Sequence, residues 1–366
     1  MSWPNWLPLR ETLRPMSPYG APQVPAVASL NTNENPYSPS PALQKAITDA
    51  VAKVAVDLNR YPDRDAIILR TKLATYINEG NGTSFTVDNI WAANGSNEII
   101  QSIFLAFAQG TVLGFTPSYS MHPLIAKTTG AQWIDGKRNA DFSLNASDAV
   151  SEILKNKPTL TFITTPNNPT GGAVTLAEIQ KLADAAKEVG GLLVVDEAYA
   201  EFSQEVSAVT LIANNPHVIV IRTMSKAFAF AGARLGYLVS DVAVKNAMMI
   251  VRLPYHLSAL TQAAAQVAID HRAELLGGVS TLIKARGEVV QALHDMGLTT
   301  ITSSANFVLF TGFKQDAPQL WAALLEKGVL IRDVGLSGYL RVTIGNEAEN
   351  QLFVSALKEL IQRRYP

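Results

Sequence analysis

The 366-residue chain contains no cysteine, which excludes disulfide bonds, thiolate catalysis and cysteine-based zinc sites. A large charge of either sign is also missing, since 30 Lys and Arg residues against 31 Asp and Glu residues give a formal net charge of −1. Nucleic acids and anionic membranes are attracted by a basic surface, so we expect neither as a partner. The five histidines show no metal-ligand spacing, and no metal site is predicted.

Two kinds of apolar segment are absent as well. No apolar run reaches the roughly 18 residues typical of a membrane-spanning helix, and the amino-terminal residues lack the basic and apolar regions of a secretory signal. These absences predict a cytoplasmic protein. Hydrophobic residues make up 48% of the chain, which is enough for a large core and for one large domain plus a smaller one.

The first two thirds of the chain predict an arm and an α/β domain. Residues 1–36 are rich in Pro, Asn and Ser without sustained periodicity, and we interpret them as an arm lying over another surface. Helices are predicted over 42–54 and through Leu73 and Ile77. Short β-rich runs then alternate with helical patterns, over 89–93, 111–115, 159–164, 192–195, 218–223 and 236–239. This alternation predicts a large domain over 37–256 with a mainly parallel central sheet flanked by helices.

The last third follows a different pattern. Residues 257–295 are predicted to be helical, and strands and helices alternate after them without a parallel-sheet signature. We therefore expect a smaller α+β domain over 257–366. The elements predicted within it are strands over 305–310, 330–333 and 340–344 and helices over 318–327 and 347–363.

Polar clusters follow the predicted strands of the large domain, at the edge where open α/β sheets bind ligands. The first cluster contains Gly95, Ser96 and Asn97, where a helix is predicted to begin after a tight turn. Free N–H groups and the helix dipole favour a phosphate there, although an ordinary helix cap has the same sequence. Thr223 and Ser225, beside Lys226, allow the same two interpretations.

Asp196 and Lys226 are the two charged residues with unusual surroundings. Asp196 ends an apolar run, 192–195, that is typical of a buried strand, so its carboxylate needs a partner. The protonated nitrogen of a pyridine cofactor is one such partner, and a metal ion or a core salt bridge are the alternatives. Lys226 stands between a strand and an apolar stretch, where partial desolvation would free its amine for imine chemistry. Most lysines are nevertheless solvated surface groups.

Taken in order, these segments resemble the fold-type I pyridoxal 5′-phosphate (PLP) aminotransferases from about Leu30 to the carboxyl terminus. Residues 164–171 match the Asn-Pro-Thr-Gly signature of that family, and residues 223–228 followed by 232–237 match its lysine signature. The resemblance implies PLP as cofactor. It implies that Lys226 holds PLP covalently and moves the proton, and that Asp196 pairs with the ring nitrogen. Asn168 and Tyr199 would bind the ring oxygen, with Lys226, Asp196 and Tyr199 as the catalytic residues.

The same resemblance implies the rest of the cofactor site. Tyr119 would stack on the ring, and the phosphate would bind among Gly95, Ser96, Asn97, Thr223, Ser225 and Arg234. Within the family, residues 30–36, 60–63 and 340–345 are similar to those of the histidinol-phosphate aminotransferases. That similarity implies a homodimer in which Tyr61 reaches the cofactor phosphate of the neighbouring subunit. It also implies Tyr19, Asn33, Arg332 and Arg341 as substrate-binding residues.

Physical support for a phosphorylated substrate is limited to Arg332 and Arg341. Arg332 is predicted to end one strand and Arg341 to lie in the next, so paired guanidinium groups could bind phosphate or carboxylate. Surface arginines in ordinary ion pairs are the alternative. We interpret His122, His217 and His256 as structural or substrate-rim groups.

The expected reaction is a transamination between L-histidinol phosphate and 2-oxoglutarate, which gives imidazole-acetol phosphate and L-glutamate, a step of histidine biosynthesis. An aromatic amino acid aminotransferase and a PLP-dependent threonine-phosphate decarboxylase would share the same cofactor residues. A non-enzymatic regulatory domain of this fold is a further alternative, although the retained Lys226 and Asp196 argue against it.

Overall fold

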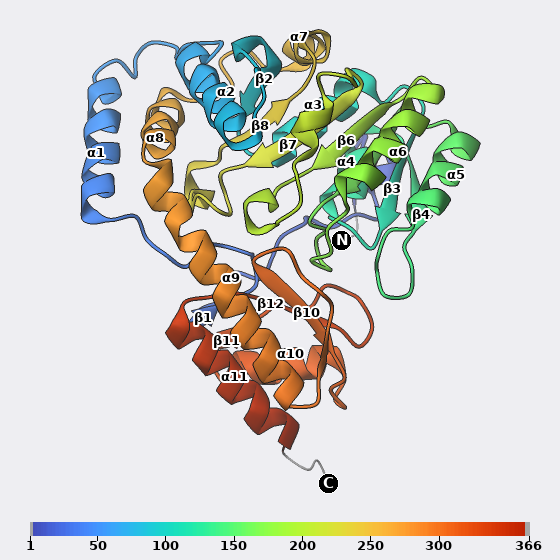
Figure 1. The fold of residues 1–366 in the computed structure, drawn as a ribbon, viewed down its shortest axis with the longest axis vertical. Coiled ribbons are helices and arrows are strands. Elements are labelled where there is room, and N and C mark those ends of the chain that lie inside the picture. Colours follow the sequence, from blue (N-terminus) through green and yellow to red (C-terminus); the bar gives the residue numbers. More distant parts are fainter. Residues whose placement is uncertain (1–2, 363–366) are drawn as a thin grey trace.

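The computed structural model describes residues 3–362. Its largest element is a seven-stranded sheet in the order β2-β8-β7-β6-β5-β3-β4 (Figure 1). Only β8 runs antiparallel to its neighbours, so the prediction of a mainly parallel sheet is confirmed. The strands are β2 (Ile90–Ala93), β3 (Thr111–Thr116), β4 (Gln132–Lys137), β5 (Leu160–Thr164), β6 (Leu192–Asp196), β7 (Val218–Thr223) and β8 (Gly236–Val239).

Helices cover both faces of this sheet, because its central strands are apolar on both sides. Along β6, Leu193 and Val195 pack into one core and Val194 packs into the other, as the alternation of side chains along a strand requires. On the Val194 side lie α3 (Ser96–Phe107), α4 (Met121–Thr129) and α7 (Val242–Val251). The other side is covered by α2 (Ile67–Asn81), α5 (Ala146–Asn156) and α6 (Leu176–Glu188).

Strand β4 was not predicted from the sequence. It forms the edge of the sheet and pairs with β3 alone. Only one of its six residues is fully buried, so it lacks the continuous apolar run by which the inner strands are recognised. The inner strands, in contrast, begin and end within one or two residues of the predicted positions.

The helices around residue 270 connect the large sheet to the smaller part of the molecule. α1 (Pro41–Ala55) packs against α8 (Ala259–Asp270), and α9 (Arg272–Asp295) continues from α8 toward the smaller sheet (Figure 1). The helical stretch predicted over 257–295 is therefore two helices separated at His271. Short 3-10 helices lie at Glu11–Leu13, Val87–Asn89, Ala200–Phe202, Ala208–Leu211 and Ala231–Ala233.

The smaller part contains two small sheets and two helices. β10 (Phe307–Thr311) pairs antiparallel with β9 (Thr299–Thr300) and β12 (Leu340–Thr343). β1 (Ala28–Ser29) belongs to the predicted arm and pairs with β11 (Val329–Leu330), so the arm is attached here by a parallel ladder. α10 (Ala317–Glu326) and α11 (Glu347–Gln362) pack together beside them. Residue 363, predicted as the end of the last helix, lies outside the described residues.

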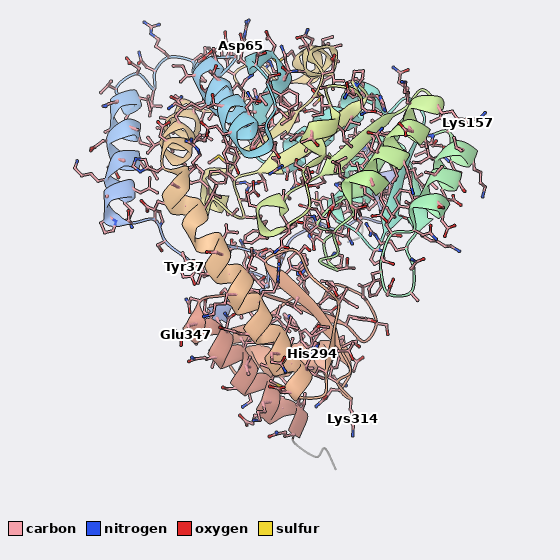
Figure 2. The ribbon with its side chains drawn as sticks, in the orientation of Figure 1. Tyr37, Asp65, Lys157, His294, Lys314 and Glu347 are labelled. Carbon is pink, nitrogen blue, oxygen red and sulfur yellow. The ribbon has the colours of Figure 1, made fainter. Side chains whose placement is uncertain are left out.

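The predicted strand over 330–333 was too long, because β11 ends at Leu330 and Arg332 makes an isolated bridge with Arg341. The proposed domain limits at residues 36 and 256 remain a prediction. No helix within residues 3–362 is long and apolar enough to cross a membrane. Charged side chains of both signs are spread over the outside, as the distant positions of exposed Lys157, Lys314 and Glu347 illustrate (Figure 2).

Candidate active site

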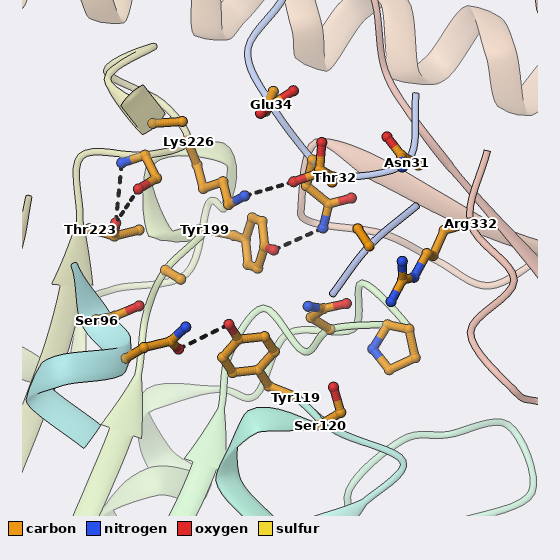
Figure 3. A pocket seen from close by; sticks show the side chains of 18 of the residues that line it. Asn31, Thr32, Glu34, Ser96, Tyr119, Ser120, Tyr199, Thr223, Lys226 and Arg332 are labelled. Carbon is orange, nitrogen blue, oxygen red and sulfur yellow. Dashed lines mark hydrogen bonds between the residues drawn. The ribbon is translucent and has the colours of Figure 1, made fainter. Parts of the chain in front are cut away.

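A cavity of about 570 Å³ lies at the carboxyl ends of β5, β6 and β7, between the large sheet, the arm and β12. Its volume is in the range of small-molecule and cofactor sites. Every predicted site residue lines the cavity except Gly95 and Tyr61, and Figure 3 labels Ser96, Tyr119, Tyr199, Thr223, Lys226 and Arg332 among them. The predicted site residues that line the cavity are Tyr19, Asn33, Ser96, Asn97, Tyr119, Asn168, Asp196, Tyr199, Thr223, Ser225, Lys226, Arg234, Arg332 and Arg341.

Lys226 follows β7 and directs its amine into the cavity (Figure 3). The amine donates to the backbone oxygen of Thr32 at 2.8 Å, and it makes no ion pair within residues 3–362. Burial, with a smaller contribution from the positive charge of Arg341, lowers the pKa of Lys226 to about 8. A far larger fraction of this amine than of a solvated lysine is therefore neutral and nucleophilic near neutral pH.

Asp196 ends β6 with 2% of its surface exposed. One carboxylate oxygen, Oδ2, lies 3.2 Å from Nε2 of His122, and the other accepts a hydrogen bond from the backbone N–H of Ala198. The partner that the sequence required is therefore partly supplied by His122, on α4, which we had interpreted only as a structural or rim group. Within residues 3–362, no cluster of three or more His, Asp or Glu side chains could hold a metal ion.

A cup of hydrogen-bond donors lies at the start of α3. The N-cap residue of this helix is Gly95, with φ +85°, so no side chain caps the first N–H groups. The side chain of Asn97 accepts a hydrogen bond from Tyr119 instead. The N–H groups at the start of α3 therefore remain available to a ligand, and the interpretation as an ordinary side-chain cap does not describe this turn.

Close packing holds a guanidinium group against this turn. A Cβ atom at Gly95 would lie 2.6 Å from Nη2 of Arg234, and a Cβ atom at Gly236 would lie 2.5 Å from the backbone nitrogen of Ser96. Ser225 accepts from Arg234 at 3.4 Å and also contacts the hydroxyl of Thr223 at 3.0 Å. Backbone N–H groups, hydroxyls and a guanidinium thus converge on one place, which is the donor set that binds a phosphate.

Two phenols and one amide lie between the cup and the small sheet. Tyr119 donates to Asn97 at 3.1 Å, and Tyr199 accepts from Asn33 at 2.8 Å. Burial raises the pKa of Tyr199 to about 12 and also raises the pKa of Tyr119, so both keep their protons near neutral pH. Asn168 accepts from Arg341 at 2.5 Å.

Arg341 is buried, and no carboxylate among residues 3–362 forms an ion pair with it. Its guanidinium donates to Asn168 and to the backbone oxygen of Asn31 and lies 5.0 Å from the centre of the Phe307 ring, while Nε has no partner within the described residues. Desolvation, aided by the nearby Arg332, lowers its pKa to about 10. An unpaired buried cation facing a cavity favours an anionic ligand. This environment is not that of a surface arginine in an ordinary ion pair.

Two of the predicted site tyrosines, Tyr19 and Tyr61, lie at the rim of the cavity or outside it. Tyr19 of the arm reaches the rim of the cavity, where the hydroxyl of Ser120 donates to it at 3.3 Å. Tyr61 lies outside the cavity of its own chain, with 80% of its surface exposed and its ring stacked 4.4 Å from that of Tyr255. The chain therefore does not bring Tyr61 to its own site.

Some residues of the site were not predicted. His122 lies three residues after Tyr119 and packs edge-on against it, so helical spacing after β3 was the available signal. Thr343 contacts Asn33 and lies two residues after Arg341, on the same face of β12. The backbone oxygens of Asn31 and Thr32 carry no signal in the sequence at all.

The chain is similar to known aminotransferases along nearly its whole length. The profile of the family described as "Aminotransferase class I and II" matches residues 25–357. The histidinol-phosphate aminotransferase of Mycobacterium sp. (strain JLS) is 51% identical over 359 residues, which cover 97% of this chain and 94% of that protein.

Solved structures agree on the fold. The histidinol-phosphate aminotransferase of Sinorhizobium meliloti, in complex with pyridoxal-5′-phosphate, superposes with a TM-score of 0.81 at 24% identity and covers 92% of both chains. The L-threonine-O-3-phosphate decarboxylase of Porphyromonas gingivalis superposes with a TM-score of 0.77 at 22% identity, over 92% of this chain and 100% of that one. The fold alone therefore does not separate transamination from decarboxylation.

Proposed function

Because the chain belongs to the class I and II aminotransferases, and within them to the histidinol-phosphate aminotransferases, we propose that it transfers an amino group between L-histidinol phosphate and 2-oxoglutarate. The products are imidazole-acetol phosphate and L-glutamate, and the reaction is a step of histidine biosynthesis. The observation that carries this proposal is a single cavity that contains a desolvated lysine, a buried aspartate, a cup of hydrogen-bond donors and a buried arginine without a carboxylate partner among residues 3–362.

The residues present fit PLP, which supplies an electron sink for the bond to the substrate α-carbon when it is bound. Lys226 would hold it covalently, and Asp196, which contacts His122, would accept a hydrogen bond from the protonated ring nitrogen. Tyr199 and Asn168 would bind the ring oxygen, and Tyr119 would contact the ring. The cup described above binds the phosphate, with Gly95, Ser96, Asn97, Thr223, Ser225 and Arg234 as its residues.

With PLP bound, Lys226 would also be the residue that transfers the proton during the reaction. Its lowered pKa, about 8, would let Nζ accept the proton from the substrate α-carbon and donate it again later in the reaction. Tyr199 stays neutral, because burial raises its pKa to about 12, and it therefore acts as a hydrogen-bond donor.

Substrate binding falls to Arg332 and Arg341, with Tyr19 at the rim. The two half-reactions alternate in one cavity, so the same groups must accept the carboxylate of glutamate and the phosphate of histidinol phosphate. A guanidinium group forms paired hydrogen bonds with either anion. Asn33 stays a predicted substrate-binding residue, and its amide also bonds to Tyr199 and Thr343.

We also propose a cytoplasmic homodimer in which the partner's Tyr61 reaches the cofactor phosphate. Two segments of the chain, 56–68 and 250–255, support this proposal. They lie side by side, joined by the stack of Tyr61 on Tyr255 and by an ion pair of 2.6 Å between Arg252 and Asp65. Both segments expose large apolar side chains, which is typical of an interface. These are Val56, Leu58, Tyr61, Ile67, Ile68, Ile250, Leu253 and Tyr255.

Half-reactions of the PLP enzyme test the substrate. We expect histidinol phosphate and glutamate each to remove the absorbance of the covalently bound cofactor, and Lys226→Ala to abolish that absorbance. Phenylalanine and tyrosine serve as competing donors, compared by kcat/KM. Rapid loss of absorbance with phenylalanine but none with histidinol phosphate would identify an aromatic aminotransferase. Release of carbon dioxide without a keto-acid acceptor would identify a decarboxylase. Full activity of Lys226→Ala would contradict the mechanism.

A further inference from the structure

A short chain of hydrogen bonds connects β12 to Tyr199 through the arm. The backbone N–H of Asn33 donates to the hydroxyl of Thr343 at 3.0 Å, and that hydroxyl donates to the side-chain oxygen of Asn33 at 3.1 Å. The side-chain nitrogen of Asn33 then donates to the phenolic oxygen of Tyr199 at 2.8 Å (Figure 3). All three side chains are almost fully buried, with exposed fractions of 1%, 2% and 4% for Asn33, Thr343 and Tyr199.

The direction of this chain is fixed at one end, because a backbone N–H can only donate. Thr343 accepts from it, so the single hydroxyl proton of Thr343 must go elsewhere. Within residues 3–362 the acceptor is the amide oxygen of Asn33. The amide oxygen therefore faces Thr343 and the amide nitrogen faces Tyr199. An amide in the opposite orientation would leave the buried Thr343 hydroxyl without an acceptor, which is costly.

The backbone of Asn33 is held in the conformation that this geometry needs. Its φ is +56°, in the left-handed region that Asn tolerates better than most residues. Asn306, next to β10, donates from its side chain to the backbone oxygen of Asn33 at 3.1 Å. The small sheet thus fixes both the backbone and the amide of Asn33.

At the other end, Tyr199 accepts from Asn33, so its own proton is left for a second acceptor. No other hydrogen bond of this hydroxyl exists within the described residues, and Tyr199 lines the cavity. We propose that Thr343 and Asn33 are positioning residues that keep the hydroxyl of Tyr199 a hydrogen-bond donor toward the ring oxygen of the cofactor. This inference rests on the proposed function, because it assigns a ligand oxygen to the proton of Tyr199.

Through this arrangement, residues of the small sheet influence how strongly the negative charge on the cofactor's ring oxygen is stabilised. A donor to the ring oxygen stabilises its negative charge, which lowers the pH at which the bound cofactor loses its proton. If the amide of Asn33 were free to turn, Tyr199 could donate to Asn33 instead, and the ring oxygen would lose that donor. Thr343 therefore acts on the cofactor without touching it.

The test is a pH titration of the absorbance of the PLP enzyme, made on the wild type and four variants. Tyr199→Phe removes the donor itself, so its titration midpoint gives the shift that corresponds to complete loss of this hydrogen bond. Thr343→Val keeps the shape of the side chain but cannot fix the amide, and Asn33→Asp, which also tolerates a positive φ, has no N–H to offer Tyr199. Thr343→Ser retains the hydroxyl and is the matched control.

We expect Thr343→Val and Asn33→Asp to raise the titration midpoint in the same direction as Tyr199→Phe, by on the order of one pH unit for the full loss of a hydrogen bond to a charged oxygen. Thr343→Ser should titrate like the wild type. Values of kcat should fall in parallel with the shift, while KM changes little. Thermal unfolding of each cofactor-free variant shows whether it is folded.

Wild-type midpoints for both Thr343→Val and Asn33→Asp, beside a shifted Tyr199→Phe, would overturn the inference and leave the proposed function intact. A Thr343→Ser variant that shifts as far as Thr343→Val would overturn it too. A Tyr199→Phe variant with the wild-type midpoint would also overturn it, since Tyr199 would then not donate to the ring oxygen. The proposed function itself fails in a different way, namely when the wild type shows no absorbance of covalently bound PLP.

Discussion

Nε2 of His122 lies 3.2 Å from Oδ2 of Asp196, and each side chain has only 2% of its surface exposed. The carboxylate is thus held from behind by an imidazole and from one side by the backbone N–H of Ala198. Its remaining hydrogen-bonding capacity faces the cavity that Lys226 also lines. The pair gives the aspartate one orientation before any ligand binds, which is the requirement for holding a charged ring nitrogen.

Replacing His122 should therefore lower the affinity for PLP without abolishing its binding. In His122→Leu, a buried carboxylate oxygen loses its partner, which costs about 1–3 kcal/mol and leaves Asp196 free to turn. We expect the Kd for PLP to rise roughly tenfold or more and kcat to fall. His122→Gln, which can still donate, is the control and should lie near the wild type. Unchanged PLP affinity and kcat in His122→Leu would show that Asp196 does not need this partner.

The pKa of Lys226 predicts how the cofactor-free enzyme captures PLP. Only the neutral amine forms the covalent link, and burial followed by the charge of Arg341 lowers the pKa of Lys226 from 10.5 to about 8. The rate of capture should therefore rise with pH below 8 and level off above it, as stopped-flow absorbance can follow. Arg341→Gln removes a positive charge beside the amine, so it should move this midpoint to higher pH. A wild-type midpoint near 10.5 would mean that the amine is solvated.

Arg332 provides the cleanest test of substrate binding, since Arg341 also holds Asn168. We expect Arg332→Gln to raise KM for histidinol phosphate roughly ten- to hundredfold, because a charge-assisted hydrogen bond to the phosphate is lost. The absorbance of the bound cofactor should stay as in the wild type. Lys155→Gln, at an exposed position on α5, controls for the loss of a positive charge. A wild-type KM in Arg332→Gln would show that Arg332 does not bind the phosphate of the substrate.

The sequence predicted the site best where the information is local. Continuous apolar runs located β6 and β7, and the residues directly after them, such as Asp196 and Lys226, fall at one edge of the sheet because parallel strands end together. The edge strand β4 was missed because it has no such run. The same reasoning indicated Gly95, Ser96 and Asn97 after β2 and Thr223 and Ser225 at the end of β7, whereas Arg234 was implied by the family resemblance alone.

Pairings between distant segments were not predictable in the same way. His122 and Asp196 are separated by 74 positions, and Asn33 and Thr343 by 310, so no local pattern indicates either contact. Asn33 illustrates the consequence. Its family position suggests a substrate-binding residue, which stays a prediction, and the contacts of its amide with Tyr199 and Thr343 come from the structure alone. Burial and hydrogen-bond partners, which require the structure, decide what such a polar side chain is free to bind.

The role of Tyr61 between subunits can be tested by complementation. Tyr61 is 80% exposed and lies outside the cavity of its own chain, so its hydroxyl should act only on the site of a partner. We expect Tyr61→Phe to keep the apolar surface and the dimer but to bind PLP more weakly. Size-exclusion chromatography with light scattering checks the dimer, and equilibrium titration gives the Kd.

Hybrid dimers of one Tyr61→Phe subunit and one Lys226→Ala subunit then separate the two arrangements. If Tyr61 acts across the interface, the subunit with an intact Lys226 receives an intact tyrosine from its partner. That site should bind PLP with wild-type affinity, and the hybrid should show about half of the wild-type activity per dimer, since one of its two sites is complete. If Tyr61 acted within its own chain, the functioning site would lack the hydroxyl, and the hybrid would keep the weakened affinity of Tyr61→Phe.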